Sequence, residues 1–85
     1  MINITVLKTD NTQEDITLTV KEGLLQTLQG IVGGYIEVIR LDPDSIMVVN
    51  EEGWLKKLPL NFKASKQLGH IILGNVVIMN DKDLK

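Results

Sequence analysis

The residue types from which most catalytic sites are built are scarce in this chain. It has no cysteine and a single histidine, His70, so one copy cannot assemble a reactive thiol, a zinc cluster or a multi-histidine metal site. His70 precedes two isoleucines at the expected start of a strand, where we expect a structural or solvent-facing imidazole. The sequence therefore predicts no catalytic residues, no metal site, no cofactor and no enzymatic activity.

Two pairs of neighbouring carboxylates could hold a hard cation or share a proton. They are Asp42 with Asp44 and Glu51 with Glu52. Both pairs lie in expected turns, and neither has the ligand spacing of a calcium loop. We therefore expect these four carboxylates to be solvated turn residues.

The segment 53–80 combines aromatic and basic residues. It contains four lysines and no acidic residue, whereas residues 1–52 contain three basic and nine acidic residues. Trp54 and Phe62 lie among these lysines, and a base can stack on an aromatic ring while ammonium groups bind phosphate. The alternative is that both aromatic side chains are core anchors and the lysines are solvated. The net charge of −2 argues against duplex nucleic acid as a partner, because non-specific DNA affinity comes from phosphate neutralisation.

Turns beside strand ends gather polar groups where a small ligand can reach them. The predicted ligand-binding residues are Tyr35, Asn50, Glu51, Trp54, Asn61 and Lys63. In this arrangement an aromatic ring stacks on a base, the two amides bind polar edges, the carboxylate takes a ribose hydroxyl and the lysine meets phosphate. The pattern favours a nucleotide-like anion as the ligand.

The elements that must position these side chains are indicated by hydrophobic periodicity. Apolar residues alternate over 2–8 and again over 16–20, as in two half-buried strands joined in a hairpin. From Glu22 to Val32 they recur at three- and four-residue steps, which predicts one amphipathic helix started by a Thr19–Glu22 capping box. The paired glycines at 33 and 34 supply the left-handed exit that ends such a helix.

The second half is predicted to be mostly β. Strands are expected over 35–41 and 46–50 with a proline turn between them, and 54–58 is a candidate partner strand. The pattern of residues 59–69 indicates a structured loop, in which one helical turn is an alternative. Residues 70–80 return to a β pattern, in which Gly74 and Asn75 form either a bulge or a hairpin turn.

The predicted fold class is α+β, a small and mostly antiparallel sheet of five to seven short strands with one amphipathic helix packed on it. Residues 1–80 form a single domain and 81–85 a frayed polar tail. The competing arrangement is an all-β barrel with a short helix as a plug.

Size and charge predict how the protein occurs in the cell. A chain of 85 residues has a small core without disulfides, and its two halves carry opposite charge, so we expect a homo-oligomer. The N-terminus lacks the features of a signal peptide, and the apolar runs are far shorter than the roughly 20 residues of a membrane-spanning helix. We expect a cytoplasmic protein that has no contact with membranes.

Four short motifs carry a family resemblance. They are Gly33–Glu37, Val49–Gly53, Leu58–Asn61 and Ile72–Val77. In order and spacing they resemble a domain-of-unknown-function family of small proteins carried by phages, plasmids and other mobile elements, over about 24–79. The resemblance implies no assigned activity and no catalytic residues. It implies a small accessory protein that acts inside a bacterium, where such proteins often counter host defence.

Two functions follow from the residues and the resemblance together. The leading expectation is a binding module that sequesters a nucleotide-like anionic small molecule. The alternative is a protein-surface inhibitor that binds a host defence protein directly, using the acidic half of the chain and needing no pocket.

Overall fold

A five-stranded antiparallel sheet forms the centre of the molecule. The computed structural model describes residues 1–84. The strands are β1 (Ile2–Leu7), β2 (Gln13–Leu18), β3 (Ile36–Arg40), β4 (Ser45–Asn50) and β5 (Val76–Asn80), and the helices are α1 (Leu24–Val32), α2 (Phe62–Leu68) and the short 3-10 helix η1 (Asp81–Asp83). The strand order is β2-β1-β5-β4-β3, so the last strand of the chain lies in the middle. The α+β class predicted from the sequence is confirmed.

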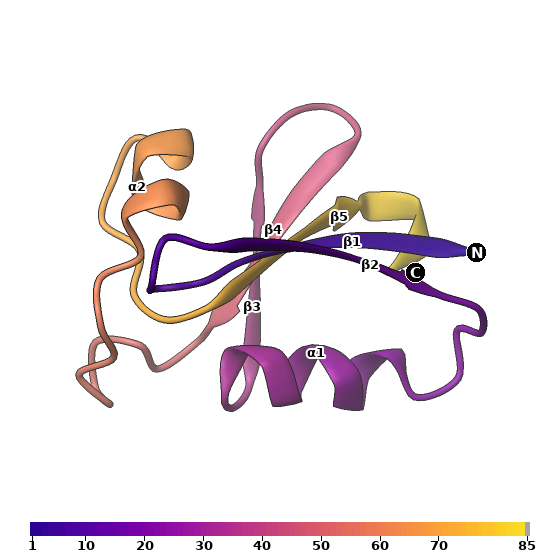
Figure 1. Ribbon diagram of the computed structural model, residues 1–85, viewed down its shortest axis with the longest axis horizontal. Helices are drawn as coiled ribbons and strands as arrows, with labels where there is room; N and C mark the ends of the chain where they lie inside the picture. Colours follow the sequence, from indigo (N-terminus) through magenta and orange to yellow (C-terminus); the bar gives the residue numbers. More distant parts are fainter. Residues whose placement is uncertain (85) are drawn as a thin grey trace.

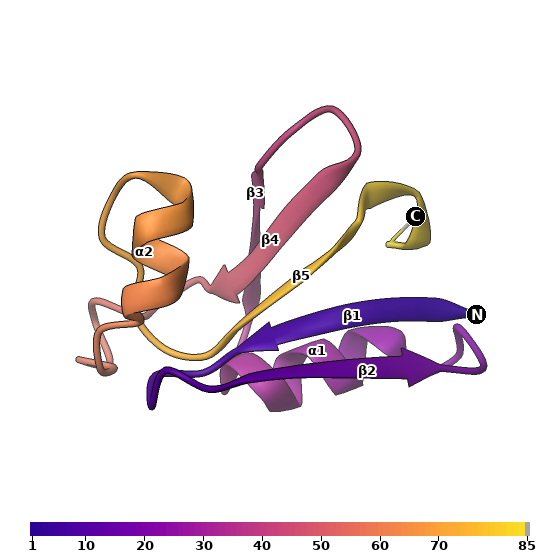
Figure 2. The ribbon, with the colours of Figure 1, turned by 45° about the horizontal axis from the view of Figure 1, so that its top comes forward.

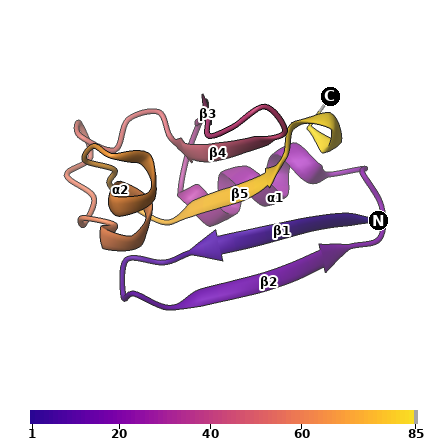
Figure 3. The ribbon, with the colours of Figure 1, turned by 90° about the horizontal axis from the view of Figure 1, so that it is seen from above.

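The two helices cover different parts of the sheet. Figure 1 shows α1 lying along one face, whereas α2 lies at the end of the molecule opposite the two termini, and Figures 2 and 3 show the same arrangement from other sides. The helix α1 buries Leu24, Leu28 and Val32, which recur every four residues and so share one stripe. The predicted helix is therefore confirmed, although the chain contains a second helix that the sequence pattern did not show.

Two clusters of buried side chains lie on opposite faces of the sheet, since neighbouring residues of a strand point to opposite sides. The cluster under α1 contains Ile2, Ile4, Val6, Leu24, Leu28, Val32, Ile46, Val48, Val77 and Met79. The cluster under α2 contains Leu7, Met47, Val49, Ala64, Ile72 and Val76. The second cluster is smaller because α2 covers only one end of its face.

Both predicted hairpins are present, but the predicted strand at 54–58 is not. Residues 51–57 form consecutive turns, in which the Lys56 N–H donates to the Glu52 carbonyl and the Leu58 N–H to the Gly53 carbonyl. The reason lies in the sheet: β4 pairs with β3 on one side and β5 on the other. No edge of β4 is left for a further strand, so this segment folds on itself.

The segment before β5 forms neither a bulge nor a hairpin turn at Gly74 and Asn75. Leu73 makes an isolated antiparallel bridge with Leu60, and the Gly74 N–H then donates to the Pro59 carbonyl at 2.7 Å. Gly74 has φ 85°, and a Cβ there would lie 2.8 Å from the Leu58 side chain. A glycine is thus required where the chain turns from this bridge into β5.

The last described residues contact the rest of the fold. Residues 81–83 form η1, the Asp81 carboxylate pairs with Arg40 of β3 at 2.9 Å, and Leu84 packs against the core cluster under α1. The frayed tail expected over 81–85 stays a prediction. Lys85 lies outside the described residues.

The predicted start of α1 is wrong, whereas its predicted end is confirmed. The N-cap is Gly23 with no side-chain cap, so Thr19 and Glu22 do not form a capping box. At the other end, Gly33 has φ 86° and its N–H donates to the Gln29 carbonyl. A left-handed residue at this position is the usual glycine exit from a helix.

We expect two glycines of this helix to respond to alanine in opposite directions. Gly30 lies inside α1, and a Cβ added there would have nothing within 4 Å, so Gly30→Ala should raise the free energy of unfolding by about 0.5–1 kcal/mol. Gly33→Ala places a Cβ at positive φ and should lower it by about 1–2 kcal/mol. Urea denaturation measures both. A stabilising Gly33→Ala would contradict this account of the helix end.

Candidate functional site

The six residues predicted to bind a ligand do not form one site. Asn50, Glu51 and Trp54 line one hollow of the surface, whose volume is about 210 Å³. Tyr35 lines a second hollow of about 180 Å³ together with Gln29, Gly34, Glu52 and Lys56. Lys63 lines a third, of about 330 Å³, with Leu7, Gln13, Lys66 and Gln67. The sixth residue, Asn61, lines none of these hollows.

Asn61 is a structural residue, which corrects its predicted role in ligand binding. Its side chain is 0% exposed. The Nδ2 group donates to the Leu7 carbonyl at 2.8 Å and to the Gly74 carbonyl at 2.9 Å, while Oδ1 accepts from the Ala64 N–H at 3.0 Å. Both amide donors are therefore used, and Oδ1 caps the first turn of α2.

Asn50 is also buried and bonded within the protein. Its Nδ2 group donates to the Val32 carbonyl at 3.0 Å, and its Oδ1 accepts from the Glu52 N–H at 2.7 Å. The amide thereby joins the last turn of α1 to the turns that follow β4. Asn50 lines the first hollow, but it holds the loop that carries Glu51 and Trp54 and has little amide capacity left for a ligand.

All three aromatic side chains are exposed. Trp54 is 70% exposed, Tyr35 67% and Phe62 58%. The alternative that Trp54 and Phe62 are core anchors is therefore wrong. Aromatic residues bury much of their surface in most folded proteins, so the exposure of all three rings is unusual for a protein of this size.

Trp54 and Phe62 belong to a group of exposed apolar side chains at the α2 end of the molecule. Leu60 is bridged to Leu73, Phe62 lies two residues after Leu60, and Ile71 lies two residues before Leu73. Asn61 and Ile72 are buried, whereas Leu60, Phe62 and Ile71 are all more than half exposed. We call this surface the apolar end; it comprises the exposed residues Trp54, Leu55, Leu60, Phe62 and Ile71 and the half-buried Leu73.

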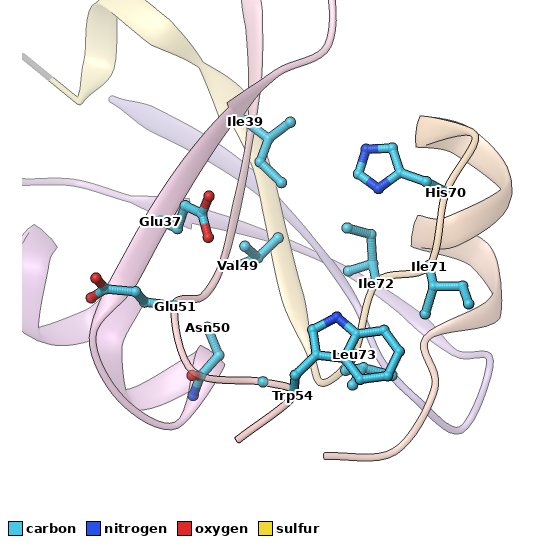
Figure 4. A pocket seen from close by; sticks show the side chains of 11 residues that line it. Glu37, Ile39, Val49, Asn50, Glu51, Trp54, His70, Ile71, Ile72 and Leu73 are labelled. Atoms are coloured by element: carbon cyan, nitrogen blue, oxygen red, sulfur yellow. The ribbon is translucent and has the colours of Figure 1, made fainter. Parts of the chain in front are cut away.

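The first hollow lies beside the apolar end, between the sheet and the segment 70–73. Its base is apolar and consists of Ile39, Val49, Ile72 and Leu73. Figure 4 shows Glu37 and Glu51 on the strand side, His70 on the opposite side and Trp54 at the lower end of the hollow. An apolar base with a ring and carboxylates at its border can hold a flat or cationic group.

Eight of the eleven residues that line this hollow were not predicted as site residues. Glu37 and Leu73 had been named only as members of the family motifs, and His70 was expected to be structural or solvent-facing. The sequence did contain a signal for the apolar end, since Leu60 and Phe62 flank a polar residue as the residues of an alternating strand do. The sequence does not show whether Asn61 or its two apolar neighbours face solvent. The structure, in which Leu60 is bridged to Leu73, shows that Leu60 and Phe62 do.

The Asp42 carboxylate, which lies outside this hollow, has a structural role in a turn. The backbone N–H groups of Asp44 and Ser45 donate to the Asp42 carboxylate at 2.9 and 2.7 Å, and these bonds hold the pKa of Asp42 below its usual value. Within residues 1–84 no group of three potential metal ligands is present. The Asp42 carboxylate thus stabilises the β3–β4 turn.

The lysines differ in their pairing. Lys56 lies 3.9 Å from the Glu52 carboxylate and donates to the Gly33 carbonyl at 3.4 Å. Lys57, Lys63 and Lys66 make no ion pair with any residue between 1 and 84. Lys63 follows Phe62 directly in the sequence, Lys57 lies two residues after Leu55, and Lys63 and Lys66 both line the third hollow.

Comparisons with known proteins place the chain in one family and give no closer relative. A family model described as "Domain of unknown function (DUF3846)" matches residues 2–84. No curated protein and no solved structure matches. Among the described residues, no helix is long and apolar enough to cross a membrane.

We expect Asn61 to matter for stability far more than an exposed asparagine does. Asn61→Ala removes all three buried hydrogen bonds of this amide and should lower the free energy of unfolding by about 3–5 kcal/mol. Asn61→Asp keeps the cap but sets a carboxylate against two carbonyl oxygens, so it should be no better tolerated. Asn3→Ala removes one exposed bond, from the Thr17 hydroxyl, and should cost less than about 0.5 kcal/mol.

Thermal denaturation of the three variants beside the parent protein is the measurement. A loss below about 1 kcal/mol for Asn61→Ala would mean that the buried amide is not the structural link described above.

Proposed function

The chain belongs to the DUF3846 family of domains of unknown function, and we propose that it is a non-enzymatic binding module that covers the surface of a partner protein. The observation that carries this proposal is the apolar end. Contiguous exposed apolar surface on a small protein commonly marks a contact with another protein. Here it includes a tryptophan and a phenylalanine, and tryptophan is among the residues that contribute most to binding at interfaces.

The composition of this surface supports a protein partner over a small molecule. Interfaces have an apolar centre and a polar rim. The apolar end has Glu37 and Glu51 at the adjoining hollow, and Lys56 and Lys63 follow Leu55 and Phe62 directly in the sequence. The hollow itself, at about 210 Å³, is smaller than the roughly 300–1,000 Å³ of most small-molecule sites. The surface suits a partner that covers it and inserts single side chains.

The resemblance to small phage and plasmid proteins extends the proposal to a setting. We propose that the protein is carried by a mobile element and acts inside a bacterial host, where it covers a surface of a host defence protein. The contact would use the apolar end. The acidic half, in which the sequence pattern suggested this contact, carries no comparable cluster of exposed aromatic side chains.

A second candidate function has one specific observation in its favour. Lys63 and Lys66 both line the third hollow, whose volume of about 330 Å³ reaches the size of a small-molecule site. A nucleotide-like anion could bind there through its phosphates. However, none of the three aromatic residues lines this hollow, so the combination of base stacking and phosphate binding that motivated this function is not supported.

We expect the apolar end to be the surface that a partner touches in cells. A photo-crosslinking amino acid in place of Trp54 or Phe62 should join the protein to one host protein during expression in bacteria. The matched control is position 20, an exposed valine in the β2–α1 connection at the opposite end of the molecule (Figure 1). Equal crosslinking from all three positions would contradict the proposal, and a product joining two copies of this chain would assign the surface to a homo-oligomer.

Substitutions should separate binding from folding. Trp54→Ser and Phe62→Ser remove exposed side chains, so the melting temperature should stay within about 4 °C of the parent. Loss of a central aromatic anchor costs about 2 kcal/mol or more, so affinity for the crosslinked partner should fall at least about 30-fold. Val20→Ser should change neither quantity. Titration calorimetry with the purified partner measures the affinity.

A thermal-shift panel of linear and cyclic nucleotides tests the second candidate. A ligand at 100 times its Kd adds about 2.7 kcal/mol, which corresponds to at least about 10 °C for a chain of this size. We expect no such shift. A shift of this size that is lost in Lys63→Ala and retained in Trp54→Ser would favour nucleotide sequestration instead.

A further inference from the structure

The hollow beside the apolar end has a border of specific chemistry. Glu37 projects from β3, and its carboxylate lies at the strand side of the hollow, while the exposed Trp54 ring lies at its lower end in Figure 4. Neither Glu37 nor Glu51 forms an ion pair with any residue of the described chain, 1–84. The hollow therefore presents unpaired negative charge and an open aromatic face above an apolar base.

These three features together fit one class of chemical group. An apolar base accommodates methylene groups, an indole face attracts a cation placed over it, and a carboxylate binds a guanidinium through paired hydrogen bonds. A phosphate or carboxylate would be repelled by Glu37 and Glu51. A neutral apolar side chain would leave those carboxylates partly desolvated without a partner, which costs free energy.

We propose that this hollow receives an arginine side chain of the partner protein, with its guanidinium stacked on Trp54 and bound to Glu37. The inference rests on the proposed function, and it adds the chemistry by which the partner is recognised. Glu51 contributes negative charge at the same side of the hollow. The side chains of Ile39, Val49 and Leu73 contact the methylene groups.

Arginine suits this hollow better than lysine does. The guanidinium is planar, so it can stack on the indole and still direct two N–H groups at a carboxylate, and it is less strongly hydrated than an ammonium group. The volume of about 210 Å³ admits one long side chain but falls short of the usual size for a separate ligand. The arginine must therefore be presented by a larger molecule that also covers the apolar end.

Blocked tripeptides test the inference without knowledge of the partner. The probes are acetyl-Gly-Arg-Gly-amide and its counterparts with lysine or citrulline, the last having nearly the shape of arginine without its charge. Trp54 is the sole tryptophan, so the single indole N–H signal in an NMR spectrum of the ¹⁵N-labelled protein reports on this hollow. The arginine peptide should shift that signal in a saturable way, with at least about threefold higher affinity than the other two.

A matched pair of variants localises the effect. Glu37→Gln removes one exposed carboxylate charge from the hollow and should weaken binding of the arginine peptide about threefold. Glu22→Gln removes an exposed carboxylate that lines none of the three hollows and should leave the affinity unchanged. Both substitutions are on the surface, so both proteins should fold, which circular dichroism checks.

Each other outcome overturns the inference. Equal affinities for the arginine and citrulline peptides would show that charge is not recognised, and equal affinities for arginine and lysine would contradict the choice of guanidinium. An unchanged affinity in Glu37→Gln would remove Glu37 from the site. The proposed function is judged separately: crosslinking from positions 54 and 62 to a partner whose affinity is unaffected by Glu37→Gln would retain the protein contact and reject the arginine.

Discussion

The buried amide of Asn61 is the interaction on which the functional end of this protein depends. Its three hydrogen bonds join the end of β1, the first turn of α2 and the turn that leads into β5. These segments are far apart in the sequence, and between them lies the smaller of the two core clusters. Because Asn61 must point inward to make these bonds, Leu60 and Phe62 on either side of it point outward. The constraint that stabilises this end of the fold thus also places apolar side chains in solvent.

The central position of β5 has a comparable effect on the loop that carries Trp54. With β5 on one side of β4 and β3 on the other, the chain after Asn50 has no strand to pair with. It forms turns, held at one point by the Asn50 amide bonding both α1 and the loop. Trp54 lies in these turns and borders the hollow beside β3 and β4, with most of its ring exposed. Its exposure follows from the order of the strands.

These two constraints redirect the expected function. The residues predicted for a nucleotide site were polar and aromatic groups near strand ends. In the structure the amides of Asn50 and Asn61 bond within the protein, and the other four predicted residues lie at three separate hollows. The structure instead brings apolar side chains together, those of the bridged segments at Leu60 and Leu73 and that of Trp54. Beside them lies a hollow with carboxylates at its border. Such a surface supports recognition of a protein, and the unpaired charge of Glu37 and Glu51 supports recognition of a basic side chain within that contact.

Local pattern alone determined the α+β class, α1, both hairpins and the glycine exit at Gly33, because alternation, helical periodicity and turn chemistry act over a few residues. It did not determine α2, a seven-residue helix with one buried residue, Ala64, whose formation depends on the cap from Asn61. Local pattern also did not determine which polar side chains are left unbonded within the protein and could contact a ligand. The pattern around Asn61 is that of a surface residue in a proline-containing loop, and the pattern around Trp54 allows a core anchor. In the structure Asn61 is buried and Trp54 is exposed. The first environment depends on the pairing of Leu60 with Leu73, and the second on the insertion of β5 between β1 and β4. A sequence pattern a few residues long contains no information on either contact.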